Sequence, residues 1–190
     1  MKFKNLGITG LLCAVIGLRG ADQSVLIKVT NGTATFDAET NHKSVSIKGK
    51  STKMVGEVNV TGTNAGLHLS KISARVPAKT FATGMALRNA HLIKYIFTTE
   101  DGSTPDLTFT SGETECAASG PCVVEGMFAI RDKPKPLTLA LKIVYDGAGF
   151  KVSGDGKIKL SDYMITPPEE FGVIMKDEVL FHLEFYGGDK

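Results

Sequence analysis

GKIKLSDYMITPPEEFGVIMKDEVLFHLEF, residues 156–185, carries the pattern that decides the fold of this chain. The stretch begins as a strand, passes through a connection that contains Pro167 and Pro168, and returns as a second strand. The returning strand has apolar residues at every second position: Val179, Phe181, Leu183 and Phe185. Because side chains of a strand point alternately to its two faces, this pattern predicts a β-strand with one buried face.

The same period of two runs through most of the chain from Val25 onward. Asn31-Gly32 is typical of a tight hairpin turn, so we expect a hairpin with strands at 25–30 and 33–38. Alternation predicts further strands at 45–48, 54–60, 67–76, 107–109, 124–130, 137–145, 150–160 and 179–185.

Two kinds of irregularity interrupt the predicted strands. Within 67–76 the apolar residues move from odd-numbered to even-numbered positions. A β-bulge near Ser70 would add one residue and keep the apolar side chains of both halves on the same face. Turns are predicted where glycine and proline cluster: Asp101-Gly102, Lys133-Pro134-Lys135-Pro136 and Asp146-Gly147-Ala148-Gly149.

In residues 84–96 the apolar side chains recur with the period of a helix instead of the period of a strand. The sequence therefore predicts one helix here. One face carries Met85, Leu92 and Ile96, with Leu87, His91 and Tyr95 close beside it. Eight or nine strands around a single helix are too many for a small open sheet, and closure removes the exposed edges. We therefore predict an all-β fold, a single antiparallel β-barrel of about eight strands with one short helix.

A barrel of this size either fills its interior with side chains or holds one elongated ligand. Small residues at inward positions favour a cavity, and the alternative is that the glycines mark bulges and bends in coiled strands. The small inward positions are Gly56, Gly126, Gly154, Gly156, Ala34, Ala38 and Ala74.

The N-terminus differs from the rest of the chain. A basic start is followed at 6–18 by an apolar run that is too short to span a bilayer. We interpret residues 1–21 as a signal peptide, cleaved near Gly20 or Ala21, and residues 22–190 as one barrel domain. A lipid anchor at Cys13 is disfavoured because a large residue, Leu12, precedes it.

Charge argues against nucleic-acid binding. Removing residues 1–21 takes away three of the 22 basic residues and none of the 20 acidic ones, which leaves a net charge of −1. The remaining basic residues alternate with strand residues instead of clustering, so the electrostatic footprint of a nucleic-acid site is absent from the sequence.

Cys116 and Cys122 bracket five residues of turn chemistry. Two adjacent antiparallel strands would bring them within bridging distance, which favours a structural disulfide formed in an oxidising compartment. A redox pair has two intervening residues, and the sequence has no second Cys or His pair to complete a zinc site. So short a loop stabilises the fold by about 2 kcal/mol at most.

Catalytic motifs are missing from the sequence. It contains neither a nucleophile elbow nor a phosphate-binding or dinucleotide-binding loop. The four histidines, His42, His68, His91 and His182, lack metal-ligand spacing. His91 can be read as a solvent-facing or capping imidazole, or as a polar group at the head end of a ligand. We predict no enzyme activity, no metal and no cofactor.

Three segments, taken in order, resemble the YceI-like family. They are GMALRNAHLIKY leading to PDLTFTS, VEGMFAIRDKPKPLTLALKI, and LSDYMITPPEEFGVIMKDEVLFHLEF. The resemblance covers about 25–185 and implies a lipocalin-like periplasmic barrel that holds a polyisoprenoid-type lipid, with the helix capping one mouth. The chain departs from commoner members around Val45–Thr52 and in its cysteine hairpin, so the ligand class transfers less safely than the barrel.

The leading functional hypothesis is therefore a periplasmic carrier for an elongated apolar lipid, polyisoprenoid or quinone-like, without stable membrane insertion. A stress-response or interaction protein with a filled barrel is the alternative, and a hydrolase or transferase would need a polar triad that the sequence does not offer. An open barrel end also allows a homodimer, although no patch specifies one. Inward parity and the helix predict these pocket residues: Phe36, Ile47, Val58, Leu69, Met85, Leu87, His91, Phe109, Phe128, Leu141, Val152 and Phe181.

Overall fold

A computed structural model of the chain describes residues 24–63, 65–117, 120–145 and 149–187. The predicted signal peptide at 1–21 lies outside the described residues, and so do Asp146 to Ala148 of the predicted turn at 146–149.

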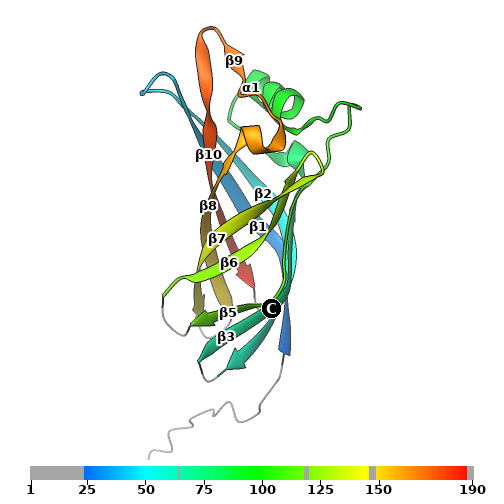
Figure 1. Ribbon diagram of the computed structural model, residues 1–190, viewed down its shortest axis with the longest axis vertical. Helices are drawn as coiled ribbons and strands as arrows, with labels where there is room; N and C mark the ends of the chain where they lie inside the picture. The colour runs from blue at the N-terminus through cyan, green and yellow to red at the C-terminus, as the bar shows by residue number, and fades with distance from the viewer. Residues whose placement is uncertain (1–23, 64, 118–119, 146–148, 188–190) are drawn as a thin grey trace, which may run out of the picture.

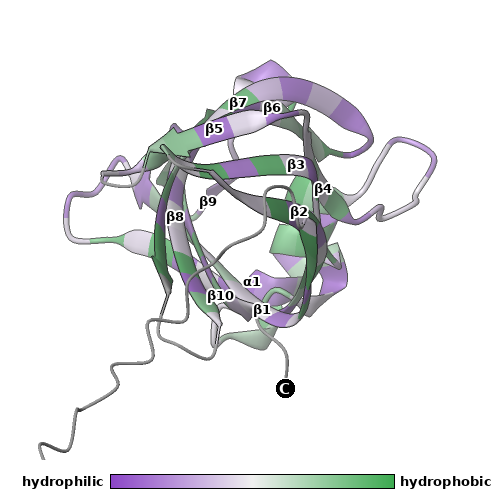
Figure 2. Ribbon diagram, turned by 90° about the horizontal axis from the view of Figure 1, so that it is seen from below, coloured by the Kyte–Doolittle hydropathy of each residue, from purple (hydrophilic) through white to green (hydrophobic). Residues whose placement is uncertain are grey.

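Eight antiparallel strands form a closed barrel, as the sequence predicts (Figures 1 and 2). Each strand pairs with the next, and the last pairs with the first through a register that includes Phe36 opposite Phe181. In order around the barrel the strands are β1 (Ser24–Thr40), β2 (Ser46–Thr63), β3 (Gly66–Val76), β4 (Leu107–Ser111), β6 (Cys122–Ile130), β7 (Lys133–Tyr145), β8 (Phe150–Lys159) and β10 (Val173–Gly187).

Two short strands complete the sheet at opposite ends of the barrel (Figure 1). β5 (Thr114–Ala117) continues the place of β4 beside β3, at the end away from the helix. β9 (Glu169–Glu170) pairs with the first residues of β10 and lies near the helix at the other end.

The predicted hairpin at Asn31-Gly32 is wrong. β1 runs without a turn from Ser24 to Thr40, and the predicted strands at 45–48 and 54–60 are likewise one strand, β2. Gly32 instead leaves room for the side chain of Met54 on β2, because a Cβ atom at this position would lie 2.4 Å from its Cε. The pairing of β1 with β2 shifts register here, so the long-range ladder overrides the local turn preference.

The β-bulge predicted near Ser70 is confirmed. Glu57 lies opposite Ser73 and Asn59 opposite Ser70, so β3 has one residue more than β2 at this point. The extra residue is accommodated with Lys71 at φ 50°. The extra residue shifts the apolar positions by one, so that the apolar side chains of both halves of β3 face the interior of the barrel.

The turn predicted at 133–136 lies two residues too late. Arg131 and Asp132 have φ of 54° and 56°, as in the tight two-residue turns that join antiparallel strands. Pro134 and Pro136 belong to β7 and lie opposite β6 residues. β7 pairs with β8 only over Ala140–Tyr145, so the prolines occupy a part of the strand with one strand neighbour, where a missing N–H is tolerated.

The predicted helix at 84–96 is confirmed as α1 (Ala86–His91) followed directly by a π-helical turn, η2 (Leu92–Phe97). It lies at one end of the barrel, the upper end in Figure 1. Two hydrogen bonds fix its ends: the backbone N–H of Thr83 donates to Oδ1 of Asn89 at 2.7 Å, and Nε of Arg131 donates to the carbonyl of Ile96 at 3.0 Å. The turn between β6 and β7 therefore holds the helix over the barrel mouth.

Two short 3₁₀ turns pack at the same end. η1 (Ala78–Thr80) follows β3, and Ser51 and Thr80 join it to β2 through a hydroxyl hydrogen bond of 2.6 Å. η3 (Leu160–Tyr163) follows β8, and Asp177 on β10 accepts hydrogen bonds from the N–H and hydroxyl of Ser161. These hydrogen bonds, the hydroxyl one above all, lower the pKa of the Asp177 carboxyl.

Candidate functional site

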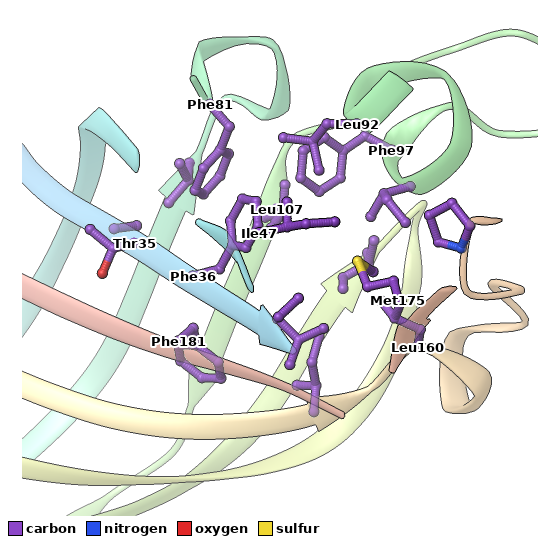
Figure 3. A pocket seen from close by; sticks show the side chains of 18 of the residues that line it. Thr35, Phe36, Ile47, Phe81, Leu92, Phe97, Leu107, Leu160, Met175 and Phe181 are labelled. Atoms are coloured by element: carbon purple, nitrogen blue, oxygen red, sulfur yellow. The ribbon is translucent and has the colours of Figure 1, made fainter. Parts of the chain in front are cut away.

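A cavity of about 420 Å³ lies inside the barrel beneath α1, within the range of pockets that hold small ligands. Apolar side chains from the strands, the helix and the connections make up nearly all of its lining. Figure 3 shows Phe36, Phe81 and Phe97 grouped around this space, with Met175 and Leu160 on another side. The cavity therefore has the chemistry of a site for an apolar ligand.

Aromatic contacts build the wall of the cavity. Phe81 lies between two rings, with its centroid 5.8 Å from that of Phe36 and 5.7 Å from that of Phe97. Phe181, the partner of Phe36 in the β1–β10 ladder, stacks on Phe128 with centroids 5.8 Å apart and an interplanar angle of 15°. Phe36, Phe128 and Phe181 face inward yet are only half-buried, because they border the cavity.

The polar residues of the lining are few. They are Thr35, Arg88, His91 and Glu170, and the last three belong to the helix and β9 at the mouth. Nδ1 of His91 lies 2.7 Å from Oε1 of Glu170, so this pair joins α1 to β9 across the opening. An amphiphile bound here would find hydrogen-bonding partners at the mouth and apolar surface below it.

The rim of the mouth is apolar and exposed. Val45, Met85, Leu87 and Phe171 line the cavity and are also exposed on the outside of the protein. Phe171 is the extreme case, 98% exposed at φ 52° in the turn between β9 and β10. Large apolar side chains gathered around an opening, unlike single scattered ones, mark a place where apolar molecules enter or dock.

The structure divides the twelve predicted pocket residues between two cavities. A second, smaller cavity of about 80 Å³ lies in the half of the barrel away from the helix. The large cavity is lined by Phe36, Ile47, Met85, Leu87, His91, Phe109, Phe128 and Phe181. The small one is lined by Val58, Leu69, Leu141 and Val152, and Phe109 reaches both.

Sequence reasoning missed the residues that close the large cavity from above. Phe81 and Phe97 flank the predicted helix, Leu160 and Pro168 come from the connection between β8 and β10, and Met175 lies near the start of β10. A hydrophobic residue just outside each end of the helix was the available signal for the first two. The connection has no period from which its inward residues could be read.

The inward glycines do not create the large cavity, which corrects the expectation from their size. A Cβ atom at Gly154 would lie 2.4 Å from Cδ2 of Leu141, and one at Gly126 would lie 2.5 Å from Cζ of Phe109. Each glycine instead lets a neighbouring large side chain lie flat against the strand. Among the small residues, Ala34, Ala38 and Ala74 do line the cavity.

Each of three histidines in the described part of the chain pairs with a single carboxylate. His68 pairs with Glu115 at 2.6 Å and His182 with Asp155 at 2.8 Å, both at partly exposed positions far in sequence from the His91 pair. No group of three His, Cys, Asp or Glu side chains is placed to hold a metal among these residues. Within the same residues, no helix combines the length and the apolar character that crossing a bilayer requires.

The predicted disulfide between Cys116 and Cys122 is confirmed, with an S–S distance of 2.00 Å and Cα atoms 4.8 Å apart. It joins β5 to β6, and both cysteines are buried in the hydrophobic cluster of the half that holds the small cavity. The bridge therefore stabilises the end of the barrel opposite the helix.

Comparison with known proteins agrees with this geometry. The profile of the YceI-like domain matches residues 24–186, which is nearly the whole described chain. The chain belongs to the YceI-like family. Proteins of this family are binding proteins, which fits an apolar cavity. No curated protein matches the chain.

Solved structures share the YceI-like fold at low sequence identity. BcnA of Burkholderia cenocepacia is similar with a TM-score of 0.65 and 20% identity over 80% of this chain and 95% of BcnA. The YCEI protein of Campylobacter jejuni has a TM-score of 0.64 and 22% identity, covering 80% and 91% of the two chains. A polyisoprenoid binding domain from Saccharophagus degradans, implicated in plant cell wall breakdown, has a TM-score of 0.63 and 14% identity, covering 88% and 100%.

Proposed function

We propose that this YceI-like barrel binds and carries an elongated apolar lipid, of polyisoprenoid or quinone type, in the periplasm. One observation carries the proposal: the large cavity is enclosed by eight strands, is almost wholly apolar, and has its few polar groups near one mouth. The name of the similar Saccharophagus degradans domain, a polyisoprenoid binding domain, supports the same class of ligand.

Burial of the apolar chain would supply the affinity. Each methylene transferred from water into the cavity contributes roughly 0.8 kcal/mol, and association costs a part of the total. The half-buried faces of Phe36, Phe128 and Phe181 would lose their contact with water at the same time. A single apolar chain can therefore fill the cavity without a buried polar group to pair with.

The test is mass spectrometry of an organic extract from protein purified natively and without detergent. We expect a lipid with one long apolar chain in an amount comparable to the protein. The control is the same extraction after the protein has been washed with an apolar resin and reloaded with solanesol, a long polyprenol. A barrel that yields no lipid and takes up no solanesol would support the alternative, an interaction protein without a lipid ligand.

A periplasmic location is part of the proposal. The disulfide between Cys116 and Cys122 fits an oxidising compartment, and the basic and apolar start of the sequence fits export. The intact mass of protein recovered from the periplasm checks this point, and we expect it to lack about 21 N-terminal residues. The homodimer stays a prediction.

A further inference from the structure

One layer of side chains separates the large cavity from the small one. Five residues line both cavities, and they come from five different strands, so the layer crosses the barrel. They are Met54 on β2, Ala74 on β3, Phe109 on β4, Leu139 on β7 and Leu183 on β10. A molecule that enters at the helix end reaches this layer before the small cavity.

Phe109 and Met54 are held in the layer by glycines on neighbouring strands. The ring of Phe109 occupies the space of the missing side chain at Gly126, where a Cβ atom would lie 2.5 Å from its Cζ. Cε of Met54 does the same at Gly32, at 2.4 Å. Both side chains are buried, at 7% and 4% exposure, so the layer is packed although the space on each side of it is not.

The space beyond the layer has the same chemistry as the space before it. The small cavity is lined by apolar side chains that include Val58, Leu69 and Val152. At about 80 Å³ it is too small to hold a ligand of its own, since ligand pockets usually measure about 300–1,000 Å³. It is suited only to accept the end of a chain that already fills the large cavity.

We propose that the layer around Phe109 and Met54 limits the length of the lipid tail that this barrel accepts. The inference rests on the proposed function and specifies its ligand: an amphiphile with its polar head at the His91–Glu170 pair and one apolar tail that ends at the layer. A longer tail must displace Phe109 and Met54 into their packed surroundings or leave part of its length in water.

This arrangement predicts how affinity depends on tail length. While the large cavity fills, each added methylene raises the affinity by roughly fourfold. Once the tail reaches the layer, further carbons stay in water and the affinity stops rising. Removing the Phe109 ring joins the two cavities and moves this end point to a longer tail.

The test is a titration with polyprenols of increasing length: geraniol, farnesol, geranylgeraniol and solanesol. The chain has no tryptophan, so binding is followed by displacement of N-phenyl-1-naphthylamine, a dye that fluoresces in apolar sites. In wild type we expect the affinity to rise and then level off along the series. In Phe109→Ala we expect the first prenol beyond the wild-type limit to bind at least about tenfold more tightly than it binds wild type.

The matched control is Phe150→Ala, which removes a ring that lines only the small cavity and leaves the layer in place. This variant should leave the end point where wild type has it. Phe109→Leu is the second variant, because it opens the layer with a smaller loss of packing and keeps the test valid if Phe109→Ala unfolds.

Two results would overturn the inference. The first is that the affinity of wild type rises along the whole prenol series, or levels off at the same prenol as in both Phe109 variants. The layer then does not limit the tail, although the carrier function stands. If none of the prenols displaces the dye from wild type, the proposed function fails and this inference fails with it.

Discussion

In the half of the barrel beneath α1, Phe36, Phe128 and Phe181 face inward and remain half-buried, whereas in the half with the disulfide Val124 and Leu141 face inward and are buried around a much smaller cavity. The same eight strands build both halves, and both inner faces are apolar. The difference lies in what faces each wall. The helix and the connections close the first half above a large cavity, while in the second half large side chains from neighbouring strands fill most of the interior.

The largest expected effect comes from adding the same side chain to each half. Ala34→Leu extends into the large cavity, so we expect dye or prenol binding to weaken by at least about tenfold while thermal stability changes little. Gly154→Leu pushes against Leu141, so we expect a loss of roughly 1–3 kcal/mol in unfolding free energy with binding retained.

Urea unfolding and dye titration on the two variants, side by side, check this pair. Equal losses of stability in both variants, with binding unchanged in both, would mean that the two halves are packed alike. The distinction between a hollow and a filled half would then be wrong.

A second effect, which appears only above pH 10, concerns Tyr163, which closes the wall of the first half where β7 separates from β8. The side chain is 2% exposed and packs edge-on against Phe128 with centroids 6.2 Å apart. Burial, aided by the charge of Asp162, raises the pKa of its phenol from 10.0 to about 12. The hydroxyl stays protonated in the folded protein at pH values where the unfolded chain ionises.

The sign of the pH dependence follows from this shift. Below pH 10 the phenol is protonated in both states and its contribution to stability is fully present. Between pH 10 and 12 the unfolded state releases its proton first, so stability falls by about 2–3 kcal/mol in total. Unfolding free energies measured across this range should fall less steeply in Tyr163→Phe. Parallel curves for variant and wild type would contradict burial of the phenol.

The smallest expected effect is confined to the packed half. Replacing Cys116 and Cys122 together by alanine removes a bridge that spans six residues in sequence and should cost about 2 kcal/mol of unfolding free energy. Prenol binding should not change, because the bridge lies at the end of the barrel away from the helix. Reduced wild type is the matched control. A loss of binding in the double variant would show that the two halves are coupled.

The sequence predicted the wall better than the space inside it. Parity placed Phe36 and Phe181 on the inner face, and the pattern around Ser70 located a bulge, because a period of two determines which face a side chain takes. The same period says nothing about how far away the opposite wall lies. It therefore assigned Leu141 and Phe128 to one pocket, whereas they lie at two cavities.

The remaining errors occur where distant contacts override local preference. Asn31-Gly32 favours a turn, but pairing along the whole of β1 with β2 and β10 keeps the strand straight. Phe171 reaches the cavity from a connection whose course depends on β9, on the His91–Glu170 pair and on η3, and Met175 follows it near the start of β10. Residue type alone could not place them.

Pro134 and Pro136 have a consequence outside the barrel. From Lys133 to Leu139, β7 has a ladder only with β6, so its other edge is a row of backbone groups without a strand beside it. Such an edge is a template on which a second chain can pair and start an aggregate. Proline has no N–H, so the hydrogen bonds from β7 to β6 must come from the residues between the prolines. The backbone nitrogens of the two prolines therefore face the open edge. Two of the donors that intermolecular strand addition would use are therefore missing from this edge, which disfavours polymerisation through it.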